Sequence, residues 1–276
     1  MPTSAAIQQD IFAANRATGH IALGATASAG ITRRMRVHED GSLRVRFPNV
    51  EAGALEAVIV NTGGGMTGGD RFAIDIALER GASLIAGTAA AEKIYRSTGP
   101  DTEMDVRLSL GAGARLAWLP QETILFDRAR LSRRIEIDLA ESASLLVAEA
   151  VVFGRAAMGE AMVEGLFADR WRVRRGGQLV FADAARLDGA IARMLAAPAS
   201  AAGGIAIATV LIAPGDDVRL AAVRALDEQL SGEVGISAWN GIAVARLCAK
   251  DGALLRHDLI LMLAALKTAV PRLWLN

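Results

Sequence analysis

The apolar pattern on either side of a glycine-rich stretch limits the folds open to this chain. The segment VNTGGGMTGGD (60–70) holds five glycines within seven positions and follows the apolar run AVIV. Gly63, Gly65 and Gly68 have the G-x-G-x-x-G spacing of a dinucleotide-binding loop, which requires a helix directly after it. Large apolar residues instead occupy every second position of the next segment, FAIDIALE, which predicts a half-buried strand. The pattern therefore favours a tight connection between two strands, in which glycines supply positive φ angles.

A strand, a turn of small residues and a more apolar strand recur along the first two thirds of the chain. Four segments share this pattern, with turns about thirty residues apart: LERGASLIAG, LSLGAGARLAWL, LAESASLLVAEAVV and VRRGGQLVFAD. Repeated strand pairs stack into layered or helically arranged β-sheets, in which each unit buries a face on its neighbours. The spacing alone leaves unrelated hairpins of a sandwich as an alternative. We predict a mainly β fold of this layered kind.

The C-terminal part of the chain has a different pattern. GIAIATVLIA predicts a strand, VRLAAVRALDEQL a helix, and LLRHDLILMLAALKTAV a second helix with apolar residues at helical spacing. Between the helices, Asn240-Gly241 separates two strand-like runs, which is a strong hairpin signal. We predict a β-rich scaffold over residues 1–204 and an α+β region with a few helices over 205–276, packed as one continuous domain.

Composition narrows the functional classes. Thirty basic and thirty acidic side chains give no net charge that would attract nucleic acid or an anionic membrane. The longest apolar runs are shorter than the roughly 18 residues of a membrane span. One cysteine, Cys248, cannot form an internal disulfide, and the first residues lack the pattern of a secretory signal, so we expect a cytoplasmic protein. Apolar residues make up 52% of the chain, enough to bury some against a partner protein.

Few residues are spaced for catalysis or for a resident metal. His20, His38 and His257 are scattered, and the chain contains no C-x-x-C, H-x-x-x-H or G-x-S-x-G motif. Glu149 interrupts LLVAEAVVF and Asp183 follows LVFA, so each carboxylate lies within an apolar strand, where it must be paired, hydrogen-bonded or hydrated. They either face an internal polar channel or point to solvent through strand alternation.

Two groups of arginines are interleaved with apolar residues. They suit a solvated strand face, or an interface in which the guanidinium groups bind carboxylates. The groups are Arg128, Arg130, Arg133 and Arg134, and then Arg170, Arg172, Arg174 and Arg175.

Five motifs in this order resemble a known family over almost the whole chain. They are GGGMTGGD, AAAEKIYRS (89–97), WLPQETILF (118–126), VVFGRAAMGE (151–160) and the closing PRLWLN. Together they resemble the urease accessory protein family UreD, called UreH in some organisms. Thr62 and Gly63 stand where the family commonly has two prolines.

The resemblance implies a non-enzymatic assembly factor with a mainly β fold of helically arranged sheets. Members bind the accessory protein UreF and, through it, the GTPase UreG. The complex docks on apo-urease and delivers nickel to the active site as UreG hydrolyses GTP. The resemblance thus implies these three partners, leaves open a dimer of such complexes, and implies no tightly bound cofactor, only nickel in transit. Glu149 and Asp183 are the candidates for carboxylates of an internal nickel path, although neither matches a family motif.

Several residues match the family motifs and are expected to serve architecture and partner contacts. They are Gly64, Gly65, Gly68, Gly69, Asp70, Lys93, Tyr95, Arg96, Pro120, Gln121, Glu122, Gly154 and Arg155. Two alternatives remain on the residues alone: a nucleotide-dependent enzyme that uses the glycine spacing, and a carboxylate-based enzyme that pairs Glu149 with Asp183 on a β-rich fold.

Overall fold

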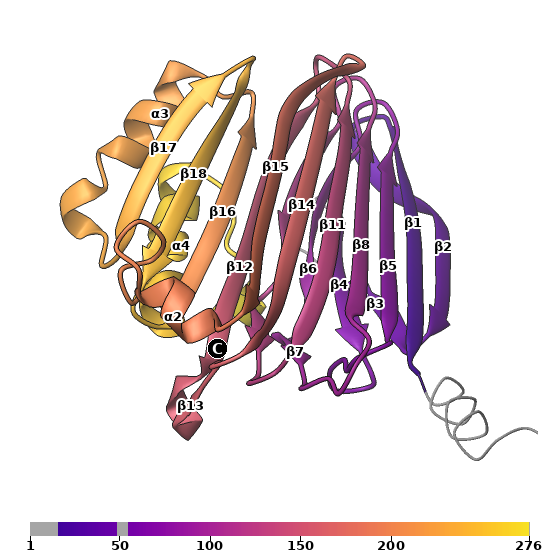
Figure 1. Cartoon of the computed structure of the whole chain (residues 1–276). Helices are drawn as coiled ribbons and strands as arrows, with labels where there is room; N and C mark the ends of the chain where they lie inside the picture. The colour runs from indigo at the N-terminus through magenta and orange to yellow at the C-terminus, as the bar shows by residue number, and fades with distance from the viewer. Residues whose placement is uncertain (1–15, 49–54, 276) are drawn as a thin grey trace, which may run out of the picture.

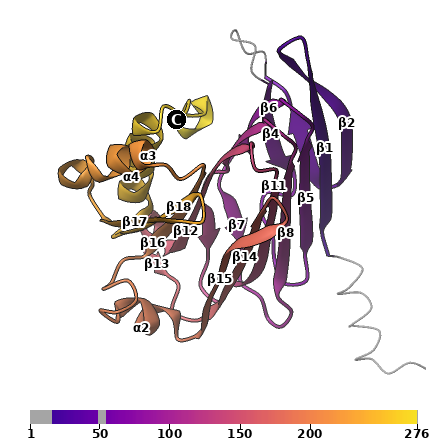
Figure 2. The same cartoon turned by 90° about the horizontal axis from the view of Figure 1, so that it is seen from above.

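Two β-sheets facing each other form most of the molecule (Figure 1 and Figure 2). The computed structural model describes residues 16–48 and 55–275, so the prediction about a signal sequence concerns positions that lie outside the described residues. Within this part of the chain, no helix is long and apolar enough to cross a membrane.

The first sheet, sheet A, has seven strands in the order β15-β14-β11-β8-β5-β1-β2. Its strands are β1 (Thr18–Ser28), β2 (Ile31–Gly41), β5 (Arg71–Leu78), β8 (Thr102–Leu110), β11 (Arg130–Leu139), β14 (Gly165–Arg175) and β15 (Gln178–Gly189).

The second sheet, sheet B, has a main path in the order β17-β18-β16-β12-β9-β6-β4-β3, joined by three short strands. The main strands are β3 (Leu43–Arg46), β4 (Leu55–Asn61), β6 (Ser83–Thr88), β9 (Arg115–Leu119), β12 (Ser144–Arg155), β16 (Ala206–Ala213), β17 (Glu233–Trp239) and β18 (Ile242–Ala249). The short strands are β7 (Glu92–Ile94), β10 (Thr123–Leu125) and β13 (Glu160–Ala161).

In the middle of the chain the longer strands alternate between the two sheets, which gives this part of the fold its helical course. The chain runs from β5 to β6, from β8 to β9 and from β11 to β12, and within each sheet these strands pair in parallel. Backbone hydrogen bonds stack the corners, as from Gly81 N to Ala112 O (3.0 Å) and from Arg115 N to Ala82 O (2.8 Å). The predicted mainly β, helically arranged fold is confirmed.

The fourth repeated segment, VRRGGQLVFAD, differs from the other three. Its strands β14 and β15 are antiparallel neighbours within sheet A. They are joined by Gly176 and Gly177, whose φ angles of 57° and 81° suit a two-residue hairpin turn rather than a corner between sheets.

The core lies between the sheets because their strands alternate apolar and polar residues. The inward rows of sheet A are buried, as at Phe72, Ile74, Ile76 and Leu78 of β5, while its outer face carries charged side chains. Strand β12 is apolar on both faces. Its outer face belongs to a second core under the helices, as expected for a strand covered on both sides.

The C-terminal elements follow the predicted pattern. β16 pairs with β12, so this segment extends sheet B, and β17 and β18 form the hairpin at Asn240-Gly241. The helices are α2 (Ile191–Ala196), α3 (Asp217–Arg224) and α4 (Gly252–Ala265), with 3-10 turns η1 (Ala156–Met158), η2 (Asp227–Gln229) and η3 (Arg272–Trp274). Figure 1 and Figure 2 show α3 and α4 lying against the outer side of these strands. Helix α2 instead follows β15, and its buried side chains belong to the core between the sheets.

Candidate functional site

Four motifs quoted from the sequence lie at one end of the molecule. They lie at, or directly after, the carboxyl ends of the four parallel strands of sheet B: β4, β6, β9 and β12. Parallel strands in register place these ends side by side, so residues far apart in sequence meet at the lower end in Figure 1. We call the segments 62–70, 89–97, 118–126 and 151–160 the motif layer.

Backbone pairing holds the motif layer together. Met66 bridges Ile94, β7 pairs with β10, and β10 pairs with β12, all in parallel. The side chains in this row, Met66, Ile94, Leu125 and Phe153, are buried and form the floor of the layer. The layer is therefore a short parallel branch of sheet B that starts from β12, built from one strand or loop of each repeat.

The glycine loop packs closely on the segment after β7. Tyr95 donates its hydroxyl hydrogen to Gly64 O (3.0 Å), and Met66 N donates to Lys93 O (2.7 Å). A Cβ on Gly65 would lie 2.5 Å from Tyr95 Cε2, and one on Gly68 would lie 1.9 Å from Ser97 Oγ. The glycines thus allow a close approach of two backbones, and strand β5 follows the loop, as predicted.

Thr62 and Gly63 use N–H groups that proline would lack. Thr62 N donates to Ser42 O (2.9 Å), and Gly63 N donates to Asn61 Oδ1 (2.9 Å). Thr62 and Gly63, which replace the two prolines common in the family, therefore make two hydrogen bonds at the start of the loop that prolines could not make.

Asp70 closes the loop from inside. Its side chain is buried, and its oxygens accept hydrogen bonds from Ala17 N (2.8 Å) and Thr67 N (2.7 Å). Gly69 beside it packs on the side chain of Arg16, where a Cβ would come within 2.7 Å of Arg16 Cδ. Asp70 thus joins the loop to the start of β1.

Replacing Asp70 with alanine is expected to lower the free energy of unfolding by about 2–4 kcal/mol, because two backbone N–H groups lose their acceptor. Asp70→Asn keeps one acceptor oxygen and should cost about half as much. Urea unfolding of both variants measures the two losses in unfolding free energy and shows whether Asp70→Ala costs more than Asp70→Asn. An equal, small loss in both would show that other groups or water satisfy the two donors.

A cavity of about 140 Å³ lies beneath the motif layer. Gly64, Gly65, Lys93, Pro120 and Gln121 of the predicted family positions line it. The remaining walls include Asn61, Thr88, Glu92, Thr123, Glu149 and the ring of Trp118, with apolar side chains from both sheets. The structure therefore brings part of the motif set together with one of the two predicted carboxylates.

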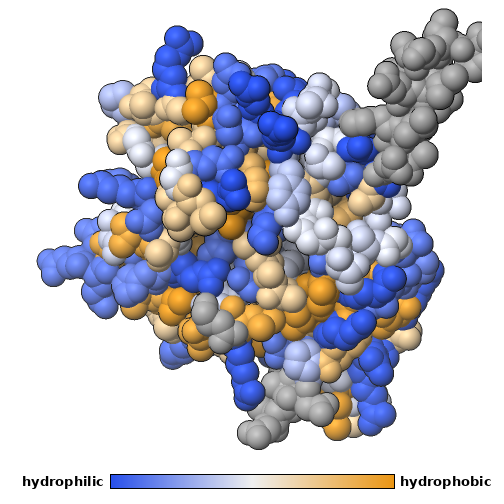
Figure 3. Space-filling model, turned by 90° about the horizontal axis from the view of Figure 1, so that it is seen from below, coloured by the Kyte–Doolittle hydropathy of each residue, from blue (hydrophilic) through white to orange (hydrophobic). Residues whose placement is uncertain are grey.

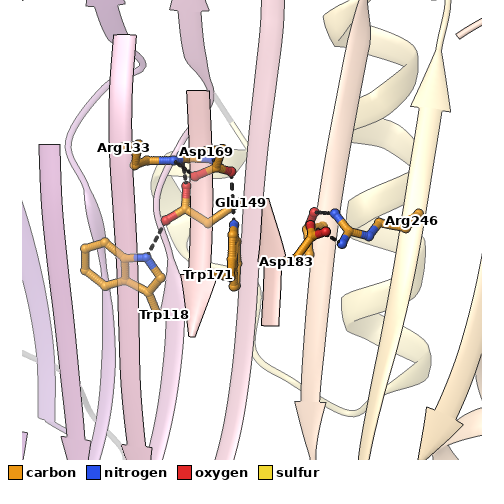
Figure 4. Close-up of polar contacts among 8 residues, drawn as sticks. Trp118, Arg133, Glu149, Asp169, Trp171, Asp183 and Arg246 are labelled. Atoms are coloured by element: carbon orange, nitrogen blue, oxygen red, sulfur yellow. Dashed lines mark hydrogen bonds and ion pairs between the residues drawn. The ribbon is translucent and has the colours of Figure 1, made fainter. Parts of the chain in front are cut away.

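Glu149 faces the space between the sheets and belongs to a buried charged cluster (Figure 4). Arg133 Nη1 donates to Glu149 Oε2 (2.6 Å), and Trp118 Nε1 donates to Glu149 Oε1 (2.7 Å). Arg133 also binds Asp169 through two hydrogen bonds of 2.9 and 2.8 Å, and Trp171 Nε1 donates to Asp169 (3.0 Å). The internal position, rather than the solvent-facing one, is therefore correct for Glu149.

Burial and pairing act against each other in this cluster. The exposed fractions of Arg133, Glu149 and Asp169 are 2%, 5% and 8%. Burial raises the pKa of Glu149, while the charge of Arg133 and the Trp118 N–H oppose this. Burial alone would lower the pKa of Arg133, but the charges of Asp169 and Glu149 outweigh it and raise the pKa.

Asp183 does not join this cluster. It lies half-buried on β15, and Arg246 Nη2 donates to Asp183 Oδ2 (2.6 Å), apart from the Arg133 cluster in Figure 4. Arg246 Nη1 also donates to Thr209 Oγ1 (2.6 Å), and Thr209 pairs with Glu149 across β12 and β16. The two predicted carboxylates thus lie at two ends of a polar row, each bound to a different arginine, which gives no support to a carboxylate-pair enzyme.

The Pro120–Glu122 segment is fixed by the C-terminal part of the chain. Arg256 of α4 donates to both carboxylate oxygens of Glu122 (2.7 and 2.6 Å) and to Gln121 Oε1 (3.1 Å). The indole of Trp274, from the closing motif, donates to Leu119 O (3.1 Å). The closing motif PRLWLN therefore packs on the motif WLPQETILF, although Leu119 and Trp274 are 155 residues apart along the chain.

Gly154 and Arg155 lie where β12 turns into η1. Gly154 has a φ of 96°, and Arg155 stacks over the ring of Phe126 at 4.1 Å and pairs with Glu160. Beside them is an open groove of about 620 Å³. Apolar surface crosses this end of the molecule in Figure 3, and Lys93, Tyr95 and Arg96 of the motif layer are exposed.

Asp169 and Glu92 were missed as site residues, and Arg133 was predicted to lie on a solvated strand face or at an interface, whereas it is buried. A usable signal existed for Arg133: it precedes Arg134 on an alternating strand, so the two must point to opposite faces. Glu92 showed no pattern, because β7 is a three-residue strand. Among residues 16–48 and 55–275, no three His, Cys, Asp or Glu side chains are placed to hold a metal ion together.

Comparison with known sequences agrees with the resemblance that the motifs indicated. The profile of the family described as UreD urease accessory protein matches residues 17–275. The chain belongs to the UreD family. It is 58% identical over 266 residues to "Urease accessory protein UreD" of Rhodopseudomonas palustris strain BisA53, covering 96% of this chain and 93% of that one.

Two Bradyrhizobium proteins are similar over their whole length. "Urease accessory protein UreD" of Bradyrhizobium diazoefficiens is 55% identical and covers 100% of both chains. "Urease accessory protein UreD 3" of a Bradyrhizobium strain is also 55% identical, over 100% of this chain and 99% of that one. UreD membership therefore applies to both the β scaffold and the C-terminal region.

Proposed function

We propose that this UreD-family protein is a non-catalytic urease maturation factor that links apo-urease to UreF and UreG and helps to deliver nickel. The observation that carries the proposal is the motif layer, in which four family motifs from separate repeats form one partly exposed surface above a cavity. A surface assembled in this way suits recognition of other proteins, since loops on a rigid scaffold commonly carry binding.

The motif layer offers both anchors and charges to a partner. Tyr95 is 37% exposed and lies between the exposed Lys93 and Arg96 along the chain, and Met158 is 73% exposed. Aromatic, methionine and arginine side chains are enriched at protein interfaces. We assign this end of the molecule to contacts within the maturation complex.

Nickel in transit would pass Glu149 and then Asp183. Glu149 lines the cavity, and Thr209 and Arg246 continue the polar row to Asp183. Each carboxylate is already bound by an arginine, so a passing cation would have to compete with a guanidinium group. Oxygen ligands under such competition bind weakly, which suits release rather than storage.

The test is nickel loading of urease in cells that express the urease operon with variants of this chain. Glu149→Gln with Asp183→Asn removes both negative charges but keeps the side-chain shapes and an acceptor for Trp118. We expect the complex with UreF and UreG to form normally, while the nickel content and activity of urease fall severalfold. Glu136→Gln, on the outer face of β11, is the matched control and should leave both unchanged.

Two results separate the parts of the proposal. Normal nickel loading in the double variant would reject the path past Glu149 and Asp183. Failure of the wild-type chain to associate with UreF, UreG or apo-urease when all are co-expressed would reject the maturation role itself.

A further inference from the structure

The glycine loop and the cavity beneath it are connected through Asn61. This residue ends β4, and its Oδ1 accepts a hydrogen bond from Gly63 N (2.9 Å). Its Nδ2 donates to Glu92 Oε1 (2.9 Å). One amide side chain therefore links the first turn of the loop to a carboxyl group in the cavity wall.

Two further hydrogen bonds hold the loop over the cavity. Met66 N donates to Lys93 O (2.7 Å), and Tyr95 N donates to Met66 O (2.7 Å). Both involve the segment that Glu92 begins. A change in the charge of Glu92 can therefore affect the glycine loop through two connections: the side chain of Asn61 and the backbone of β7.

The surroundings of Glu92 favour its neutral form. The charged neighbours are Lys93 on the same strand and Glu149, which lines the same cavity from β12. The carboxylate of Glu122 is turned to Arg256. From the other elements around the cavity come uncharged side chains: Asn61, Thr88, Gln121, Thr123, Trp118, Leu43, Ile59, Val60, Phe72, Ile74, Met104 and Val106.

We propose that the glycine loop is a latch over this cavity and that ionisation of Glu92 releases it. A neutral carboxyl group can stay under the closed loop at little cost. Glu92 is half-buried, so a carboxylate in the same place is less hydrated than it would be in water, and it favours a state in which the loop lifts and more water enters. Since the latch consists of residues of this chain alone, it does not depend on the proposed role in urease maturation.

The direction of the pH dependence follows from proton binding. Burial raises the pKa of Glu92 from 4.5 to about 7, against the smaller opposing effects of Asn61 and Lys93. With the loop open, the hydrated carboxyl returns to its ordinary pKa, so the closed state binds the proton more tightly. The closed state is fully favoured below about pH 4.5, loses about tenfold per pH unit up to about pH 7, and changes little above that.

Hydrogen–deuterium exchange of the full-length protein at pH 6 and pH 8 tests the latch. After correction for the intrinsic exchange rate, protection of the Met66 and Tyr95 amides should fall about tenfold from pH 6 to pH 8, relative to amides of β5 and β8. Glu92→Gln keeps an acceptor for Asn61 but cannot ionise, so its loop protection should not change with pH. Glu56→Gln, the same change on the half-buried part of β4, should behave as wild type.

Three outcomes would overturn the latch. The latch is excluded if, in the wild type, the loop amides are protected as strongly as the sheet amides at both pH values. This result does not depend on whether any variant folds. A pH dependence that survives in Glu92→Gln assigns the effect to another group. Asn61→Ala should leave the loop poorly protected at both pH values, and full protection in that variant would show that Asn61 is not the link.

Discussion

Replacing Arg133 with methionine is expected to lower the free energy of unfolding by about 3–5 kcal/mol at pH 7, because Glu149 and Asp169 would remain buried without their counter-charge. Urea unfolding measures the loss. The matched control is Arg134→Met, the next residue on the same strand. Arg134 pairs with Asp105 on the exposed face, so its loss should cost only about 0–1 kcal/mol.

The pH dependence of the Arg133→Met variant identifies the cause. Burial raises the pKa of Glu149, and without the charge of Arg133 this effect loses its main opposing influence, so the folded variant would bind more protons than the unfolded chain. Stability of the variant should therefore rise, relative to wild type, as the pH falls from 8 to 5.5. If the variant is less stable than wild type by the same amount at every pH in this range, the cause is lost packing rather than unpaired charge.

Gly65→Ala is expected to cost about 2–4 kcal/mol in unfolding free energy, through backbone strain and overpacking together. Gly65 has a φ of 150°, and an added Cβ would lie 2.8 Å from Lys93 O as well as 2.5 Å from the Tyr95 ring. Gly64→Ala is the control. Its φ is 75°, but a Cβ there would meet no atom within 4 Å, so only strain of about 1 kcal/mol should remain.

Urea unfolding of the two alanine variants compares these costs directly. Equal losses would show that φ alone decides the outcome. In that case the close contact between the loop and the Tyr95 segment would carry no energetic weight.

The candidate site could be predicted only in part. The motifs indicated which positions belong together, and the parallel repeat explains why they meet at one end. Glu149 was singled out as a carboxylate in an apolar strand, and it is buried there, but its partner Arg133 lies on a different sheet. Asp183 was chosen on the same reasoning, yet it pairs with Arg246 on a half-exposed edge. Apolar residues on either side of a carboxylate indicate that it lies in a strand. They do not indicate which side chain of another strand will pair with it.

The sequence by itself determined the local elements: strand alternation after the glycine loop, small-residue turns, the Asn240-Gly241 hairpin and the C-terminal helices. These depend on backbone geometry and on contacts within a few residues. The tertiary structure decided which strand faces meet, and so placed Arg133 between two carboxylates and Glu92 beneath the glycine loop. Period-two alternation fixes which side chains share a face, whereas the layer opposite that face comes from strands distant in sequence.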